Sequence, residues 1–161
     1  MPKLWNKLSS LLRPQPSEPP PVPPKSQPVK KLRPVVPLNK TIIILDDEQA
    51  SREVLASELN KRGFSAIPME SKSEGYHWIV DNQPDLIISD IKSPRMDGFE
   101  LLKMLKANPF TSDIPFIFIT AYSDRKKIDA AKELGADEFI PKPYNINQLN
   151  KIIRRLLSIK N

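Results

Sequence analysis

The sequence predicts an α/β domain built on a doubly wound, five-stranded parallel sheet with helices on both faces. From about residue 40, short apolar runs alternate five times with segments whose apolar residues recur at helical spacing. Roughly 120 residues take part, which is enough to enclose one hydrophobic core. Four of the five runs lead directly into polar or charged residues. In a parallel sheet these residues would meet at the edge where ligands bind.

The expected elements follow from local patterns, taken in chain order. Apolar runs bounded by turn residues predict strands at 41–45, 64–69, 86–88, 114–119 and 138–141. Helical periodicity predicts helices at 49–62, 73–82, 99–107, 124–134 and 146–159. Gly63 and Gly135 stand where the first and fourth of these helices should end. The crossovers between parallel strands should be right-handed.

Composition limits the chemistry of the chain. It has 161 residues and no cysteine, which excludes disulfides, cysteine metal sites and a thiol nucleophile and fits a cytoplasmic setting. No apolar stretch approaches the roughly 20 residues that a membrane span requires. The formal charge of +6 comes from residues 1–39, which carry seven basic side chains and one acidic side chain. Because the rest is formally neutral, we expect no nucleic-acid partner.

Residues 1–39 are expected to form a largely disordered arm, followed by a folded domain over residues 40–161. Residues 3–12 have apolar side chains at helical spacing, so they could dock on an anionic membrane, on a partner or on the chain's own folded domain, or have no role. Residues 13–39 are rich in proline and should form a semi-rigid spacer. Pro20–Pro23 also matches a PxxP ligand, although a plain spacer explains the same composition. Docking of the arm could hold a cytoplasmic protein peripherally at a membrane.

An acidic cluster is expected where the first and third strands end. Asp46 and Asp47 follow the first strand, and Asp90 follows the third. Neighbouring carboxylates repel one another, and ligation by oxygen alone is what Mg²⁺ prefers. The one histidine, His77, is expected to be half-buried on a helix, so a zinc or copper site is not predicted. Asp46 and Asp47 could instead cap the first helix, and both roles can coexist.

The same edge carries the groups that phosphoryl transfer requires. With a divalent cation present, Asp90 would be a plausible nucleophile toward phosphorus. Lys142, after the fifth strand, would pair with one phosphoryl oxygen, and Thr120, after the fourth, would hydrogen-bond another. Thr120 would make this bond only with the phosphoryl group in place, so it is a candidate switch. Its movement would open space for Phe139.

Together these residues resemble the signature set of response-regulator receiver domains of two-component signalling, of the chemotaxis-regulator type. The matching positions are Asp46-Asp47, Asp90, Thr120-Ala121 and Lys142-Pro143. The resemblance covers about residues 40–160. It implies the flavodoxin-like (βα)5 fold with strand order 2-1-3-4-5, and a cis peptide bond before Pro143.

The resemblance also implies roles for individual residues. Asp90 would accept a phosphoryl group from a histidine kinase or a His phosphotransfer protein. Mg²⁺ would be bound by Asp47, Asp90 and the backbone carbonyl of Lys92, with Asp46 acting partly through water. A downstream protein target would bind the output surface at about residues 124–157.

Four positions depart from the pattern or vary within the family. Ser93 stands where a bulky apolar residue is usual, and Phe139 replaces a common tyrosine at the switch position. Lys92 and Tyr122 occupy two variable positions that, in the family, tune the lifetime of the phosphoryl group. None of these changes removes the phosphoacceptor.

The sequence thus predicts a single-domain response regulator or phosphorelay intermediate that switches partner binding. Its only chemistry would be its own phosphotransfer and dephosphorylation, so it is not expected to be an enzyme. One alternative is a constitutive adaptor with an unphosphorylated receiver, tethered through its N-terminal arm. Another is an aspartate-nucleophile phosphatase, which would need a second aspartate where this chain has Lys92.

Overall fold

The computed structural model describes residues 38–121 and 124–159. The expectations for residues 3–12, for the proline-rich spacer and for Tyr122 lie outside the described residues.

Five strands alternate with five helices along the described chain. The strands are β1 (Thr41–Leu45), β2 (Ser65–Met69), β3 (Leu86–Ser89), β4 (Phe116–Thr120) and β5 (Glu138–Pro141). The helices are α2 (Gln49–Asn60), α3 (Lys72–Asn82), α4 (Gly98–Ala107), α5 (Arg125–Glu133) and α6 (Ile146–Leu156). All four strand pairings are parallel, and the order is β2-β1-β3-β4-β5. The predicted fold is therefore confirmed.

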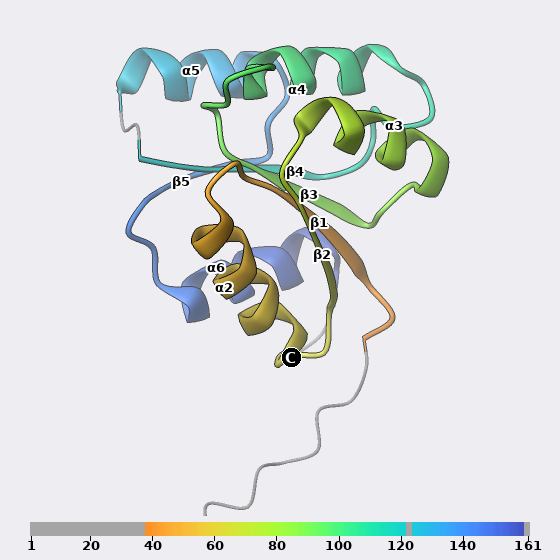
Figure 1. The fold of residues 1–161 in the computed structure, drawn as a ribbon, viewed down its shortest axis with the longest axis vertical. Helices are drawn as coiled ribbons and strands as arrows, with labels where there is room; N and C mark the ends of the chain where they lie inside the picture. The colour runs from red at the N-terminus through yellow and green to blue at the C-terminus, as the bar shows by residue number, and fades with distance from the viewer. Residues whose placement is uncertain (1–37, 122–123, 160–161) are drawn as a thin grey trace, which may run out of the picture. The chain divides into compact units, whose positions relative to one another are not determined.

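The helices cover the sheet in two layers, as Figure 1 shows: α2 and α6 lie on one face, and α3, α4 and α5 on the other. Side chains alternate along each strand, so Ile42 and Ile44 enter one apolar cluster while Ile43 and Leu45 enter the other. All four are at most 1% exposed. The central strands are thus buried on both sides, which explains their uninterrupted apolar sequence. None of the described helices is long and apolar enough to cross a membrane.

The element boundaries differ from the predicted ones where backbone conformation or capping intervenes. Phe64 precedes β2, because its N–H donates to Leu59 O at the end of α2. Helix α6 ends at Leu156, shortly before Ser158 adopts a left-handed φ of 54°. Helix α3 begins at Lys72, one residue earlier than predicted, because Ser71 caps it by accepting from the N–H of Glu74.

Candidate functional site

The predicted site residues meet at one edge of the sheet because backbone pairing continues past the strand ends. The N–H of Asp46 donates to Met69 O, and the N–H of Asp90 donates to Leu45 O. Across β4 and β5, the N–H of Lys142 donates to the Thr120 carbonyl at 2.8 Å. Parallel pairing thus holds four backbone segments in register where their side chains leave the sheet.

Asp46, Asp47 and Asp90 form the predicted acidic cluster. Each offers one carboxylate oxygen, and the three oxygens lie within 4.8 Å of one another. Asp46 is buried, Asp90 is partly buried, and Asp47 is exposed. Asp46 Oδ1 accepts the N–H of Glu48 at 2.9 Å, so it supports the turn before α2. The N-cap position itself belongs to Glu48, which makes no side-chain capping bond, so the capping alternative is wrong in its simple form.

Lys142 supplies the positive charge that this cluster needs. Its Nζ lies 2.8 Å from Asp46 Oδ2 and 3.7 Å from Asp90 Oδ2. Burial alone lowers the pKa of Lys142, but the hydrogen bond to Asp46 and the nearby carboxylates outweigh it and raise the pKa above its ordinary value. The ammonium is therefore charged at neutral pH. The peptide bond that follows it, before Pro143, is cis, as the resemblance implies.

The donor set of the cluster fits a small divalent cation. Asp90 Oδ1 is buried and accepts no hydrogen bond from any described residue. A buried carboxylate oxygen without a partner is costly. Together with two further carboxylates nearby, this oxygen suits a hard cation that takes only oxygen ligands. His77, which was predicted to be half-buried, is exposed on α3 and edge-on to Tyr76.

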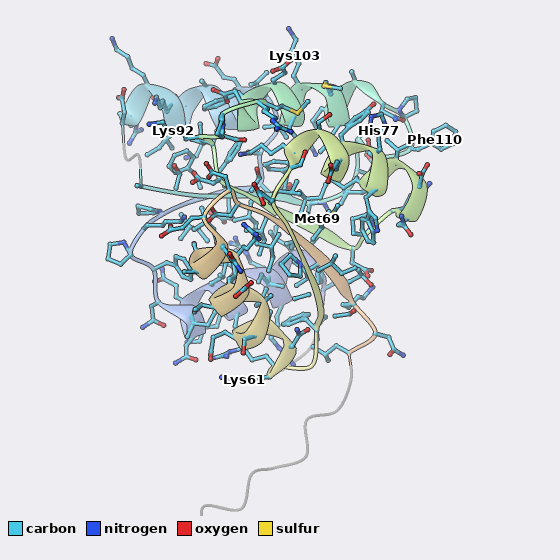
Figure 2. The ribbon with its side chains drawn as sticks, in the orientation of Figure 1. Lys61, Met69, His77, Lys92, Lys103 and Phe110 are labelled. Atoms are coloured by element: carbon cyan, nitrogen blue, oxygen red, sulfur yellow. The ribbon has the colours of Figure 1, made fainter. Side chains whose placement is uncertain are left out.

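A cavity of about 400 Å³ opens beside Asp90. Its walls are Asp47, Glu48, Asp90, Lys92, Ser93, Pro94, Thr120 and Ala121. The loop after β3 forms one wall, and Figure 2 labels the exposed side chain of Lys92 there. The carboxylate of Asp90 is thus accessible to a small anionic group at the edge of the sheet.

The two candidate switch residues lie on neighbouring strands. Thr120 ends β4 and is fully buried. Phe139 on β5 is the register partner of Phe118 on β4, and the two ring centroids are 6.1 Å apart. Phe139 is partly buried against the apolar cluster beneath α3, α4 and α5. The pairing of β4 with β5 therefore links Thr120, at the site, to Phe139.

Lys72 is the functional candidate that the sequence analysis missed. It is the first residue of α3, is 1% exposed, and donates from Nζ to the backbone carbonyl of Lys92 at 3.2 Å. Burial lowers the pKa of Lys72 below its ordinary value, and the nearby carboxylates, Asp90 first among them, oppose this shift without cancelling it. No signal in the sequence marked it, because the predicted helix began at residue 73 and Lys72 stood before its first turn.

Comparison with known proteins gives a consistent result. The family model of the response regulator receiver domain matches residues 42–154. The sporulation initiation phosphotransferase F of Bacillus subtilis is 32% identical over 123 residues, covering 76% of this chain and 98% of that protein. A probable chemotaxis protein CheY of Rhizobium etli is 35% identical, covering 70% and 88%.

The phosphate regulon regulator PhoB of Pseudomonas aeruginosa is 36% identical over 122 residues, and the chain spans about half of it, 53%. Among solved structures, a putative response regulator from Chloroflexus aurantiacus has a TM-score of 0.71 at 29% identity, covering 74% of this chain and 98% of that one. The receiver domain of a histidine kinase from Syntrophus aciditrophicus has a TM-score of 0.69 at 35% identity, covering 74% and 90%.

Proposed function

The chain belongs to the family of response regulator receiver domains, and from this we propose that Asp90 accepts a phosphoryl group from a histidine kinase or a His phosphotransfer protein. The phosphorylated and unphosphorylated forms would then bind a partner differently. The observation that carries the proposal is the environment of Asp90. One carboxylate oxygen faces Lys142 at 3.7 Å, the other accepts no hydrogen bond from a described residue, and a cavity opens beside them.

The transfer is a displacement at phosphorus. A carboxylate oxygen of Asp90 forms a bond to phosphorus while the bond from phosphorus to the donor imidazole nitrogen breaks, and that nitrogen takes up a proton. The product is an acyl phosphate and a neutral histidine. The ammonium of Lys142 is placed to exchange its contact with Asp46 for one with a phosphoryl oxygen.

We assign the cation site to Asp46, Asp47, Asp90 and the backbone carbonyl of Lys92. The three carboxylate oxygens lie within 4.8 Å of one another, and the loop that carries the carbonyl borders the same cavity. When bound, Mg²⁺ would neutralise the charge that gathers on the phosphoryl oxygens. Thr120 would hydrogen-bond the phosphoryl group, and its movement would change the packing of Phe139 on β5.

We also place the output surface at about residues 124–157. A groove of about 400 Å³ between β5 and α6 supports this assignment, since Phe139, Pro141, Tyr144, Gln148 and Ile152 are among its walls. Phe139 belongs to both the apolar cluster and the groove, so a change in its packing would alter the groove. A protein target that reads this surface would sense phosphorylation at Asp90.

Intact mass spectrometry tests the proposal. The purified chain is incubated with acetyl phosphate, with and without Mg²⁺, beside Asp90→Asn and the control Asp81→Asn. Asp81 is an exposed carboxylate on α3 whose replacement makes the same charge change. We expect one phosphoryl adduct in the wild type and in the control, dependent on Mg²⁺ and absent from Asp90→Asn. An unmodified wild type would favour the adaptor alternative, and an adduct on Asp90→Asn would move the phosphoacceptor elsewhere.

A further inference from the structure

Lys72 is a buried cation inside an acidic site. It is among the largest fully buried side chains of the described domain, at 1% exposure. Its Nζ donates to the carbonyl of Lys92, a neutral acceptor, at 3.2 Å. Within the described residues no carboxylate oxygen lies within 4.0 Å of it, so Lys72 has no direct ion pair. A buried ammonium of this kind requires compensation from its surroundings.

The compensation comes from the acidic cluster as a whole. The carboxylates that stabilise the charged form of Lys72 are, in order, those of Asp90, Asp47 and Asp46, followed by Asp97. These first three are also the cluster assigned above to the cation. Lys72 therefore draws on the same negative field that a divalent ion would use, and its ammonium also occupies the Lys92 carbonyl, one of the assigned ligands.

We propose that Lys72 is a resident cation that competes with Mg²⁺, so that the metal binds fully only when the Lys72 ammonium leaves the Lys92 carbonyl. The inference rests on the proposed function, because it concerns the same metal site. The arrangement of charges favours it: the three carboxylates of the cluster already face the ammonium groups of Lys142 and Lys72, so a divalent ion must share their negative charge with both.

A second cavity beside Lys72 could receive the displaced ammonium. Its volume is about 270 Å³, and it is lined by Asp47, Glu70, Ser71, Lys72, Ser93, Pro94 and Arg95. Asp47, Ser93 and Pro94 also line the cavity beside Asp90, so the two spaces share walls. The carboxylate of Glu70 in this cavity is largely exposed and lies 3.7 Å from Arg52, so it offers the displaced ammonium an acceptor that remains in contact with solvent.

Calorimetric titration of the full chain with MgCl₂ tests the proposal. The variants are Lys72→Met, which keeps the apolar stem and removes the charge, and Lys103→Met, which removes one charge from the exposed outer surface of α4 (Figure 2). We expect Lys72→Met to bind Mg²⁺ at least about tenfold more tightly than the wild type, which corresponds to about 1.4 kcal/mol. Lys103→Met should stay within about twofold, because solvent screens a distant exposed charge. Equal or weaker binding by Lys72→Met would overturn the inference.

A second measurement uses the wild type and does not depend on the folding of a variant. The lysine ε-carbons are labelled for NMR, and the Lys72 signal is assigned by its loss in Lys72→Arg. We expect Mg²⁺ to shift this signal and narrow it as the ammonium leaves the buried position. An unchanged Lys72 signal while the metal binds would refute the displacement.

Neither readout requires phosphorylation, so the two proposals can fail separately. Suppose that acetyl phosphate gives no adduct on the wild type, while Lys72→Met binds Mg²⁺ more tightly than the wild type. This result would reject the phosphoacceptor role and leave the competition intact. A phosphoryl adduct together with unchanged Mg²⁺ affinity in Lys72→Met would do the opposite. If neither the wild type nor Lys72→Met binds Mg²⁺, the competition is rejected whatever the mass spectra show.

Discussion

Gly98→Ala should destabilise the domain and disturb Asp90, the proposed phosphoacceptor, whereas Gly75→Ala should do neither. Both glycines are helical and buried, at the start of α4 and within α3. A methyl group on Gly98 would lie 2.6 Å from the backbone oxygen of Asp90 and 2.9 Å from the Cα of Ile91. Ordinary contacts between carbon atoms are about 3.5–4.0 Å. The close approach is reinforced by the Gly98 N–H, which donates to Ile91 O at 2.7 Å.

The matched change at Gly75 meets a different kind of atom. Its methyl group would lie 2.4 Å from Leu45 Cδ2, and the next nearest atoms also belong to that side chain. The end of a leucine can rotate and repack, while the backbone of Asp90 is fixed by its pairing with β1. Alanine also gains about 1 kcal/mol over glycine in a helix interior. The two effects should nearly cancel at Gly75, leaving a change within about 1 kcal/mol.

For Gly98→Ala, overpacking against the backbone should cost about 1–3 kcal/mol. With a urea dependence of about 1–3 kcal/mol per molar for a small domain, the unfolding midpoint should fall by roughly 1 M. Urea titration by circular dichroism measures both variants, and acetyl phosphate labelling compares their rates. We expect slower labelling of Gly98→Ala alone, since its clash displaces Asp90, the proposed nucleophile. Wild-type stability in Gly98→Ala, or a larger loss in Gly75→Ala, would refute the distinction between backbone and side-chain contacts.

Three further changes test individual polar contacts by urea unfolding. Lys142→Met should lower stability by about 1–3 kcal/mol by stranding the buried Asp46 carboxylate, while Lys103→Met should not. The pKa of Lys142 is raised in the folded state. The difference in unfolding free energy between the wild type and Lys142→Met should therefore be complete below pH 10.5, the ordinary pKa of lysine, and should vanish as the pH rises through the folded-state pKa. Burial raises the pKa of Asp85, but the ammonium of Lys40 at 2.7 Å and the backbone N–H of Thr41 lower it more. Asp85→Asn should therefore lower the free energy of unfolding by about 1 kcal/mol at pH 7, and by progressively less below about pH 4 as the carboxylate is protonated. Thr111→Val should cost about 1 kcal/mol at every pH, because its buried hydroxyl donates to a carbonyl of α4 at 2.8 Å; a loss that varies with pH would contradict this origin.

The sheet could be predicted from the sequence because its determinants are local. Each central strand is a continuous apolar run, and a parallel sheet collects the carboxyl ends of its strands at one edge. Residues that directly follow a strand, such as Asp46, Asp90 and Lys142, are therefore placed by the same pattern that identifies the strand. The helix ends were less predictable, because they depend on single residues such as Ser71, whose capping bond is not visible in the apolar periodicity.

Lys72 could not be placed by that logic, because it comes from a helix and reaches a carbonyl 20 residues away in the chain. By periodicity, a lysine at the start of α3 is an ordinary solvent-facing residue. Its burial results from tertiary structure: α3 packs on the face of the sheet that carries Leu45, and the start of the helix then meets the loop after β3. The carboxylates of the acidic cluster make this burial tolerable, since an ammonium without them would be expelled to solvent or lose its proton. The acidic cluster therefore explains both why the site could hold a cation and why a buried ammonium is tolerated beside it. Under the proposed competition, the affinity of the site for Mg²⁺ would be set by the difference between these two interactions and not by the carboxylates alone.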